Sequence, residues 1–508
     1  MSAPAAADRG PDLSLGVTLA DFGGRPMLRG HVGEQAVLLA RLDDEVVAVG
    51  ADCTHYGGAL DQGLIVGETV RCPLHHACFS LRTGQALAAP AFDAIACWRV
   101  EQVGDRYFVR EAKAAAAATP CAHEQGGPER IVIVGGGAAG FAAAEMLRRR
   151  GFAGSVVMLS ADADAPCDRP NLSKDYLAGQ APEEWIPLRP AEFYAEQRID
   201  LRLGVNVERI DLAAREVIAR GGERFAYDRL LLATGAEPIR LPIPGAEQPH
   251  VFTLRSLADS RALIARAATA RSAVVLGSGF LGLEVAAALN ARGVQVHVVS
   301  LDARPLERVL GAALGDLLQG LHEGHGERFH MQTSIARIDA DRVILANGTV
   351  LAADLVVLGI GVKPRVDLAA AAGLAVDRGI VVDARLQTAV PGVYAAGDVA
   401  RWPGGPDGQS ARVEHWVVAE RQGQVVAANM LGADEPYRDV PFFWSAHHEL
   451  TIRYAGYAPE WDEVLIEGDL AAHDALLRYR KHGKTLAVAA IGRDRQVLEQ
   501  AQALAVGV

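Results

Sequence analysis

Cysteine is scarce in this sequence, with six among 508 residues. Six are too few for the disulfide framework of a secreted domain, so the composition favours a reducing compartment and we expect a cytoplasmic protein. The first ten residues, MSAPAAADRG, also lack the charged and then apolar segments of a secretion signal. The longest apolar runs lie inside glycine-rich turns, so we expect no membrane-spanning helix.

Positive charge is in deficit as well. Lysine and arginine number 50 against 62 aspartates and glutamates, which gives a net charge of −12. Binding to nucleic acid needs a surplus of basic side chains, so we expect no nucleic-acid partner. Half of the residues are hydrophobic and 22% are charged. A globular chain of this composition and length is expected to form several domains, each with its own core.

Two glycine-rich turns are the most informative feature that the sequence does have. Residues 131–134 (IVIV) run into Gly135, Gly137 and Gly140, and a helix-compatible run of small residues follows as far as Leu147. This is the strand, turn and helix of a dinucleotide-binding unit, in which glycines let the backbone approach a pyrophosphate at the helix N-terminus. One such turn alone could also be a simple bend in an α/β sheet.

The same unit recurs once. Residues 273–276 (AVVL) lead into Gly277, Gly279 and Gly282, and Glu284 follows. Two units in one chain indicate two dinucleotides. The economical interpretation is a flavoprotein that binds FAD and is reduced by NAD(P)H.

The N-terminal region combines short strands with paired cysteines and histidines. Residues 12–112 alternate in polarity between Gly and Asp turns and are predicted to be all-β. Cys53 and His55 share one short segment, and Cys72 and His75 share another, so two loops can close over one metal centre. Two Cys and two His could hold tetrahedral zinc. They could also hold a 2Fe-2S cluster, with thiolates on one iron and imidazoles on the other.

The C-x-H and C-x-x-H loops resemble those of Rieske ferredoxin domains, as do Gly57 and Gly58 in the first loop and Pro73 in the second. The resemblance covers about the first hundred residues. It implies a Rieske 2Fe-2S cluster whose metal ligands are Cys53, His55, Cys72 and His75.

Two residues near these loops depart from that pattern. His76 stands where glycine is usual, and we expect its imidazole to face solvent rather than to act as a fifth ligand. Cys78 is expected to be a small packed thiol.

A second resemblance begins at Asp168, where the chain reads DRPNLSK. It is similar to flavoprotein reductases of the ferredoxin-reductase and apoptosis-inducing-factor type, which carry D-R-P-x-L-S-K beside the flavin. The resemblance implies that Arg169 and Lys174 flank FAD. It also implies that Lys174 pairs with Glu284 near the nicotinamide, and we assign these two as catalytic. Without it, an arginine and a lysine in a loop would be interpreted as solvated charge.

The order of motifs from about residue 130 to 508 matches the same family. Further cofactor contacts implied by the resemblance are Thr234 and Gly235 where the chain leaves the FAD domain, Gly361 against the nicotinamide, Gly397 and Asp398 near the ribityl or pyrophosphate group, and Glu414, His415 and Trp416 at the start of a helix under the flavin ring. For Asp398 the alternative interpretation is a helix N-cap.

Both nucleotide units lack the acidic residue that usually ends the second strand and binds a ribose. The first ends in Ser160, with Asp162 and Asp164 just beyond, so the FAD ribose contact is not assigned. The second ends in Ser300, with Arg304 nearby, so NADH and NADPH both stay open as donors.

The predicted fold is therefore an all-β Rieske domain, then an α/β flavoprotein with two dinucleotide-binding domains of the glutathione-reductase type, and a small α+β C-terminal reductase domain. The combination is similar to the Rieske-bearing, apoptosis-inducing-factor-3-like reductases. The predicted boundaries are 1–112 for the Rieske domain, 113–128 for a linker, 129–255 and 383–435 for the FAD domain, 256–382 for the NAD(P) domain, and 436–508 for the C-terminal, dimerisation-like domain.

The predicted activity is hydride transfer from NAD(P)H to FAD, then single-electron transfer to the Rieske centre and on to an external acceptor. An oxygenase or another ferredoxin is compatible as that acceptor, and a homodimer is left open. One alternative is a redox-sensing interaction protein that responds to bound NAD(P)H. A second is a reductase whose Rieske domain is only structural. A third is a single-cysteine disulfide reductase using Cys167, because no second cysteine follows it to form a dithiol. We expect Cys167 only to pack and Cys121 to be an exposed linker thiol.

Overall fold

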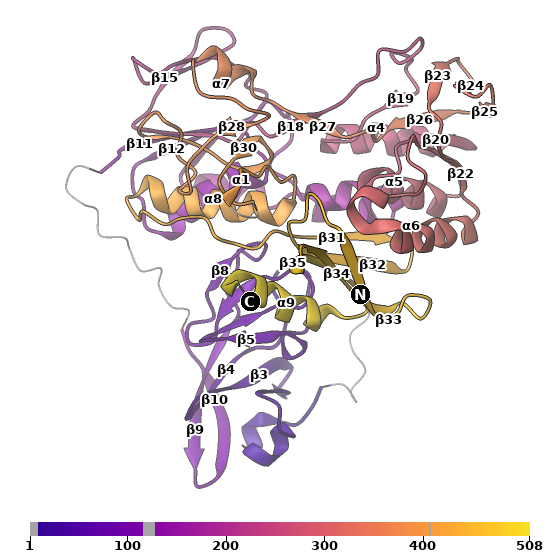
Figure 1. The fold of residues 1–508 in the computed structure, drawn as a ribbon. Coiled ribbons are helices and arrows are strands. Elements are labelled where there is room, and N and C mark those ends of the chain that lie inside the picture. Colours follow the sequence, from indigo (N-terminus) through magenta and orange to yellow (C-terminus); the bar gives the residue numbers. More distant parts are fainter. Residues whose placement is uncertain (1–8, 115–126, 406–407, 508) are drawn as a thin grey trace. The chain divides into compact units, whose positions relative to one another are not determined.

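The structure, a computed structural model, describes residues 9–114, 127–405 and 408–507 (Figure 1). The chain divides into two compact units, Met1–Pro120 with Arg493–Val508, and Cys121–Gly492. Most of the predicted linker, with Cys121, lies outside the described residues. In the part of the chain that the structure describes, no helix is both long and apolar enough to cross a membrane.

The smaller unit is built from two antiparallel sheets. The first has the order β1 (Val17–Thr18), β10 (Arg106–Ala112), β9 (Cys97–Val103), β4 (Glu45–Gly50), β3 (Gln35–Leu42) and β2 (Met27–Val32). The second is β5 (Leu64–Val66), β6 (Thr69–Arg71), β7 (Cys78–Ser80) and β8 (Ala86–Ala88). The unit also contains the short helices η2 (Leu13–Leu15), η3 (Leu19–Phe22) and η4 (Leu60–Gln62), and the C-terminal helix α9 (Asp494–Val506).

Strand β3 shows how this unit is packed. Side chains alternate between the two faces of a strand. Val37 and Leu39 accordingly lie in one core, whereas Leu38 and Ala40 lie in the other, together with Cys53 and its neighbours. The first sheet is therefore covered on both faces, and one face supports the loops that carry the cysteines.

The larger unit begins with a five-stranded parallel sheet. Its order is β13 (Ile199–Arg202), β12 (Ser155–Leu159), β11 (Arg130–Val134), β17 (Arg229–Leu232) and β29 (Val393–Ala395). Helix α1 (Ala138–Arg149) packs against strands β11 and β12, and α8 (Trp416–Met430) packs beside α1 (Figure 1). The remaining elements of this domain are η5 (Arg169–Ser173), α2 (Asp175–Ala178), η6 (Glu183–Trp185), α3 (Ala191–Glu196), β14 (Val207–Asp211), β15 (Glu216–Ala219), β16 (Arg224–Ala226), α7 (Asp367–Ala371), β28 (Ile380–Val381), η7 (Gly397–Val399) and β30 (Ala400–Arg401).

A second parallel sheet repeats this arrangement. Its order is β19 (Val251–Phe252), β26 (Leu355–Leu358), β20 (Ser272–Leu276), β21 (Gln295–Val299) and β22 (Arg328–His330). Each parallel sheet is accompanied by a three-stranded antiparallel sheet, which comes just before β17 in the first domain and just before β26 in this one. Here its strands are β23 (Ile335–Ile338), β24 (Arg342–Leu345) and β25 (Val350–Ala352). The helices of this domain are α4 (Leu257–Ala267), α5 (Phe280–Ala291) and α6 (Glu307–Gly324). The repeat explains why the sequence carries the same glycine pattern twice.

The chain crosses between the two nucleotide domains on a two-stranded antiparallel ribbon. The strands are β18 (Ala236–Pro238) and β27 (Val362–Pro364), with Ala236 opposite Pro364. The apolar run of residues 355–364 (LVVLGIGVKP) predicts one continuous strand, and this prediction is wrong, because the structure divides the run into β26 and β27. Gly361 has a φ of +99°, which turns the chain out of the parallel sheet after β26 and into the ribbon.

The C-terminal part of the larger unit is a five-stranded antiparallel sheet. Its order is β31 (Phe442–His447), β32 (Leu450–Gly456), β35 (Lys484–Ile491), β34 (Asp474–Lys481) and β33 (Glu463–Asp469). Ile452 and Leu477 from this sheet share one buried core with Leu283 of α5 and Leu310 of α6. The Tyr479 hydroxyl also donates a hydrogen bond of 2.9 Å to the Leu310 carbonyl. The sheet is thus fixed to the second nucleotide domain.

Candidate functional site

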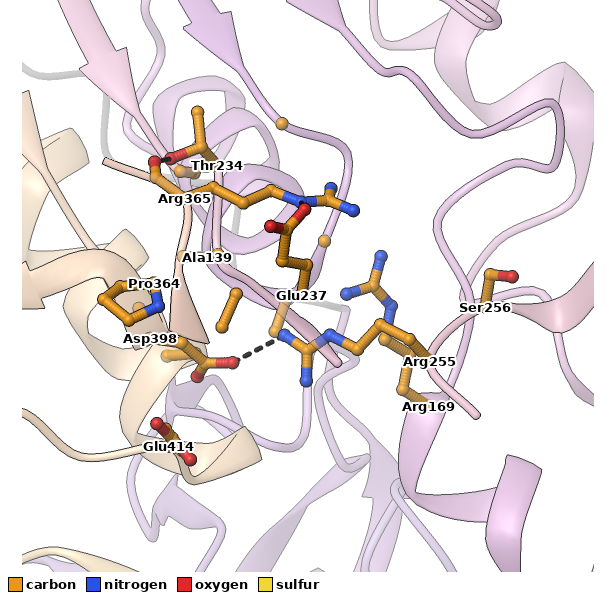
Figure 2. A pocket seen from close by; sticks show the side chains of 18 of the residues that line it. Ala139, Arg169, Thr234, Glu237, Arg255, Ser256, Pro364, Arg365, Asp398 and Glu414 are labelled. Atoms are coloured by element: carbon orange, nitrogen blue, oxygen red, sulfur yellow. Dashed lines mark hydrogen bonds and ion pairs between the residues drawn. The ribbon is translucent and has the colours of Figure 1, made fainter. Parts of the chain in front are cut away.

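The larger unit contains a cavity of about 1500 Å³ (Figure 2). Pockets for one small molecule usually span roughly 300–1,000 Å³, so this one has room for an extended ligand. Of the sequence-predicted residues, those that line it are Gly135, Gly137, Arg169, Lys174, Thr234, Gly235, Glu284, Gly397, Asp398, Glu414, His415 and Trp416. Gly140, Gly277, Gly279, Gly282 and Gly361 are not among its lining residues.

The first glycine turn is shaped by two close backbone approaches. Gly135 has a φ of +120°, and a Cβ there would lie 2.1 Å from the Ala233 carbonyl oxygen. A Cβ on Gly140 would lie 1.9 Å from the Gly135 carbonyl oxygen, so Gly140 closes the turn from beneath. Gly137 is the N-cap of α1 and offers no capping side chain. The helix N-terminus therefore lines the cavity as a seat for an anionic group such as a pyrophosphate.

Arg169 lies next to this turn. Its guanidinium would be 3.6 Å from a Cβ on Gly137, and its Nη2 is 2.9 Å from Asp162 Oδ2. Burial lowers the pKa of Arg169 below its usual value. Ser160, at the end of β12, is buried against the same turn, since its Oγ would be 2.6 Å from a Cβ on Gly136. Positive charge and helix N-terminus thus meet at one end of the cavity.

Lys174 and Glu284 form a buried ion pair, as expected from the sequence. Lys174 Nζ lies 2.8 Å from Glu284 Oε2, and the side chains are 14% and 6% exposed. The same oxygen accepts a hydrogen bond of 2.6 Å from Ser173 Oγ, while Oε1 accepts one of 2.6 Å from Ser445 Oγ. The first nucleotide domain, the second and the C-terminal sheet therefore all contribute to one carboxylate.

Asp398 also lines the cavity. Its Oδ2 is 2.5 Å from Arg255 Nη2, as Figure 2 shows. The N-cap interpretation of Asp398 is wrong, because Ala396 is the N-cap of η7 and His415 is the N-cap of α8. Gly397 has a φ of +79° and donates its N–H to Gln422 Oε1 at 2.8 Å. This turn directs the Asp398 carboxylate into the cavity.

The start of α8 also lines the cavity. Burial lowers the pKa of His415 to about 4, so the imidazole is neutral near pH 7. Its ring centroid lies 4.4 Å from that of Phe443. Burial raises the pKa of Glu414, which pairs with Arg412 at 2.6 Å. Thr234 donates to the Arg365 carbonyl at 2.8 Å, as drawn in Figure 2.

Glu420 is buried on α8, one helical turn beyond the start of the helix. One of its carboxylate oxygens has no hydrogen-bond partner among the described residues. Burial, and then the nearby Asp168, raise its pKa well above the usual value. The folded protein therefore holds a proton that the unfolded chain releases.

We expect Glu420→Gln to stabilise the protein increasingly as pH rises. Above the ordinary glutamate pKa of about 4.3 the folded state binds more protons than the unfolded state, so this group's contribution to stability falls with rising pH. The neutral amide removes that slope, which is at most ~1.4 kcal/mol per pH unit. Thermal unfolding at about pH 5 and about pH 8 measures the difference, with the exposed Glu192→Gln as control. A difference between Glu420→Gln and the parent that does not change with pH would contradict the assignment.

The second glycine turn repeats the geometry of the first. A Cβ on Gly282 would lie 2.1 Å from the Gly277 carbonyl oxygen, whereas one on Gly279 would meet no atom of the described chain within 4 Å. Ser278 and Ser300 share a hydrogen bond of 2.8 Å between their hydroxyls. Arg304, the residue suspected of favouring NADPH, is paired with Asp316 and Glu307 on α6. The turn therefore has the shape of a nucleotide site, but the charge of Arg304 is already balanced by these two carboxylates.

In the smaller unit, the cysteine and histidine loops are closed by matching backbone hydrogen bonds. In the first loop Cys53 N–H donates to the Gly58 carbonyl, and Gly57 N–H donates back to Cys53, both at 2.9 Å. In the second, Cys72 N–H donates to the Ala77 carbonyl at 2.9 Å, and His76 N–H donates back to Cys72 at 3.1 Å. The loops are two copies of one turn.

His76 occupies the place that Gly57 has in the first loop. Both have left-handed backbone, with φ values of +62° and +68°, and this explains why glycine is usual at that position. The expectation that His76 faces solvent is wrong, because the residue is only 5% exposed. The turn directs its side chain inward. Cys78 is a buried thiol, as expected, and Cys167 is buried too.

The four metal-binding candidates form two separate pairs. The thiols of Cys53 and Cys72 are within hydrogen-bonding reach of each other, and the Nδ1 atoms of His55 and His75 are 3.2 Å apart. Among the described residues, the only set of three or more donor atoms within 4.8 Å of one another lies elsewhere in the chain. One tetrahedral zinc would bring all four donors to within about 4 Å of each other. Two pairs fit a two-iron cluster and do not fit a single zinc.

Sequence reasoning missed Ser445, Arg255 and Glu420. Ser445 is the one polar residue inside an apolar strand, which was the available signal for it. Arg255 and Glu420 stand in segments without a motif, so only the fold brings Arg255 to the cavity and buries Glu420 on α8.

Comparison with known proteins identifies the family of this chain. Residues 129–423 match the family described as pyridine nucleotide-disulphide oxidoreductase. The chain belongs to that family. Residues 18–99 match the Rieske [2Fe-2S] domain, and residues 442–508 match the reductase C-terminal domain.

One relative matches nearly the whole chain, and two other proteins match about three quarters of it. The chain is 35% identical over 496 residues to apoptosis-inducing factor 3 of Mus musculus, covering 94% of this chain and 81% of that one. It is 38% identical over 370 residues to the anthranilate 1,2-dioxygenase system ferredoxin–NAD(+) reductase component of Burkholderia cepacia, covering 72% and 91%. Among solved structures, the covalent putidaredoxin reductase–putidaredoxin complex matches with a TM-score of 0.72 at 33% identity, covering 74% of this chain and 93% of that one.

The predicted fold class and cofactors are thereby confirmed. The chain is an oxidoreductase of this family that uses FAD, NAD(P)H and a Rieske 2Fe-2S cluster for electron transfer. The cavity fits the flavin nucleotide, since its glycine turn excludes side chains and faces the N-terminus of α1. The paired thiols and imidazoles fit the cluster.

Proposed function

We propose that the chain passes electrons from NAD(P)H through FAD and its Rieske domain to an acceptor of the ferredoxin or oxygenase type. The observation that carries this proposal is the Glu284 carboxylate, where both nucleotide domains and the C-terminal sheet converge beside the large cavity. When bound, FAD accepts two electrons from NAD(P)H, and a Rieske cluster takes one at a time.

The residues around the first glycine turn would hold FAD. Gly137 and Gly140 let the start of α1 approach the pyrophosphate, and Arg169 adds positive charge beside it. Asp398, held by Arg255, would accept hydrogen bonds from the ribityl hydroxyls. Thr234, Gly235, Gly397, Glu414 and Trp416 would complete the contacts.

Lys174 and Glu284 would orient the nicotinamide against the flavin. A buried carboxylate that accepts three hydrogen bonds has little freedom to move. It therefore holds the Lys174 ammonium at a fixed point on the cavity wall. Neutral His415 and the ring of Phe443, which also line the cavity, would help to exclude water.

The cluster would be bound by Cys53 and Cys72 on one iron and by His55 and His75 on the other. Burial lowers the pKa of His55 to about 4, which keeps the lone pair of this imidazole available for a metal. The other members of the loops, including His76, would shape the backbone rather than bind iron.

Relatives support the choice of acceptor. One is named as the ferredoxin–NAD(+) reductase component of a dioxygenase system, and another as rhodocoxin reductase. We propose a cytoplasmic location, which is supported because none of the five described cysteines forms a disulfide. A homodimer through the C-terminal domain is part of the same proposal.

Stopped-flow mixing with NADH under anaerobic conditions tests the function. We expect fast flavin bleaching followed by reduction of the cluster, seen in visible and electron-spin spectra. Slow bleaching with a long-lived charge-transfer complex would instead favour a redox-sensing protein. Single-cysteine disulfide chemistry is disfavoured, because burial raises the pKa of Cys167 and keeps it a thiol.

The second glycine turn gives a matched pair of variants. Gly279→Ala should fold normally and keep its flavin, because the new methyl group meets no protein atom within 4 Å. We expect it to raise the KM for NAD(P)H, since the methyl group would occupy the space of the pyrophosphate. Gly282→Ala should lower the melting temperature, because its Cβ would be 2.1 Å from a carbonyl oxygen. Steady-state kinetics and thermal unfolding separate the two, and an unchanged KM in Gly279→Ala would place the nucleotide elsewhere.

A further inference from the structure

A buried histidine cluster lies in the larger unit, formed by His322, Glu327, His447 and His448. His322 is near the end of α6, Glu327 immediately precedes β22, His447 ends β31 and His448 follows in the turn to β32. These residues line neither the cavity nor the glycine turns. No part of the proposed function uses them.

Two imidazoles converge on one carboxylate in this cluster. His322 Nδ1 is 2.5 Å from Glu327 Oε2, and His448 Nε2 is 2.9 Å from Oε1. All three donor atoms lie within 4.8 Å of one another. The side chains of His322 and Glu327 are fully buried, and that of His448 is 8% exposed.

The charge of this cluster is not balanced by a permanent cation. The Glu327 carboxylate is bonded to both histidines, one at each oxygen. Among the described residues its ion-pair and hydrogen-bond partners are histidines alone. A buried carboxylate needs an opposite charge nearby. A protonated imidazole or a metal cation could supply it here.

A hydrogen-bond partner outside the three ligands, here called an outer partner, favours the metal over a protonated imidazole. His322 Nε2 is 3.3 Å from Nδ1 of the fully buried His447. A histidine that binds a metal through one ring nitrogen usually bonds through the other, and this fixes the orientation of its ring. His325 stacks on the ring of His448, with ring centroids 3.8 Å apart, and this contact limits the movement of the second ligand.

We propose that His322 Nδ1, the Glu327 carboxylate and His448 Nε2 bind one divalent transition-metal ion. Two imidazoles and one carboxylate form a common zinc ligand set, whereas Mg²⁺ and Ca²⁺ prefer oxygen ligands. The ring protons now shared with the carboxylate move to the other ring nitrogens, so each imidazole presents a lone pair. On His322 that proton points at His447.

The site would join the second nucleotide domain to the C-terminal sheet. Its ligands come from α6, from the segment before β22 and from the turn after β31. Strand β31 also carries Ser445, which donates a hydrogen bond to Glu284. A bound metal would therefore stabilise the strand that supports the ion pair of the cavity.

Zinc uptake by the full chain with its flavin and iron in place tests the proposal. We expect equilibrium dialysis against Zn²⁺, followed by elemental analysis, to find one more zinc in the parent than in His448→Ala or Glu327→Gln. His447→Gln should bind about 10–100-fold more weakly, as expected for an outer partner. His482→Ala, at a histidine whose side chain is 85% exposed, should match the parent.

A second measurement keeps the proposal falsifiable if a buried variant fails to fold. Zinc should raise the melting temperature of the parent, and crystals soaked in Zn²⁺ should show an anomalous peak between His322, Glu327 and His448. Equal zinc content in the parent and Glu327→Gln, or no peak there at saturating zinc, would overturn it. Zinc found only at Cys53 and Cys72 would count as the same negative result.

Discussion

Lys174→Met is expected to slow flavin reduction by NADH about 100-fold, the scale of effect that a misplaced catalytic geometry produces. Among the described residues, Lys174 is the only cation paired with the Glu284 carboxylate, which is 6% exposed. Glu284 would keep its two serine partners but would lose its charge balance. Breaking a buried pair in this way also costs about 3–5 kcal/mol of stability. Stopped-flow absorbance and thermal unfolding measure the two effects separately.

The double variant Lys174→Met/Glu284→Leu separates structure from chemistry. Replacing both members of a buried ion pair by apolar residues is often neutral for stability, so we expect its melting temperature to recover. Flavin reduction should stay slow, because the ammonium and carboxylate are both absent. Fast reduction in the double variant would show that the pair only holds the domains together. Ser445→Ala, which removes one of three hydrogen bonds, should have a smaller effect on both readouts.

Cys72→Ser is expected to abolish the Rieske cluster while NADH still bleaches the flavin. The serine hydroxyl is not a thiolate, so one iron loses a ligand and the two-pair arrangement fails. Reduction of an artificial dye that takes electrons from the flavin should continue. Iron and acid-labile sulfide analysis, together with the electron-spin spectrum of the reduced protein, measures the loss.

Cys78→Ser is the matched control for that experiment. Cys78 is also a buried thiol, but it lies in β7, just beyond the hydrogen bond between Cys72 and Ala77 that closes the loop. We expect this variant to keep its cluster. Loss of the cluster in both variants would mean that packing, rather than ligation, is responsible. An intact cluster in Cys72→Ser would remove Cys72 from the ligand set.

The features that could be predicted from the sequence are those that a short backbone motif encodes. The glycine turns at Gly135 and Gly277 each combine a strand, a left-handed residue and a helix start within ten residues. The C-x-H and C-x-x-H segments are equally local. Their function depends on backbone geometry that neighbouring residues determine, so the sequence was sufficient.

Features that depend on tertiary contacts were missed or mistaken. Ser445 donates a hydrogen bond to Glu284, 161 positions earlier in the chain, and no local pattern identifies this partner. The strand predicted over 355–364 divides because Gly361 directs the chain to a partner that periodicity does not reveal. His76 is buried because its left-handed backbone turns the ring inward. In the first two cases the deciding partner is remote in the sequence, whereas His76 departs from the glycine that is usual in its turn.

The paired ribbon of β18 and β27 has a consequence for the history of the chain. Because the two strands are antiparallel neighbours, the segment 239–361 leaves its host and returns to it at one place. Strands β17 and β29, which flank the interruption, pair directly with each other. A domain can be inserted into another without disrupting it when the two ends of the inserted segment lie close together. An ancestral protein with one nucleotide site could have acquired its second in a single insertion event, without breaking the sheet that received it.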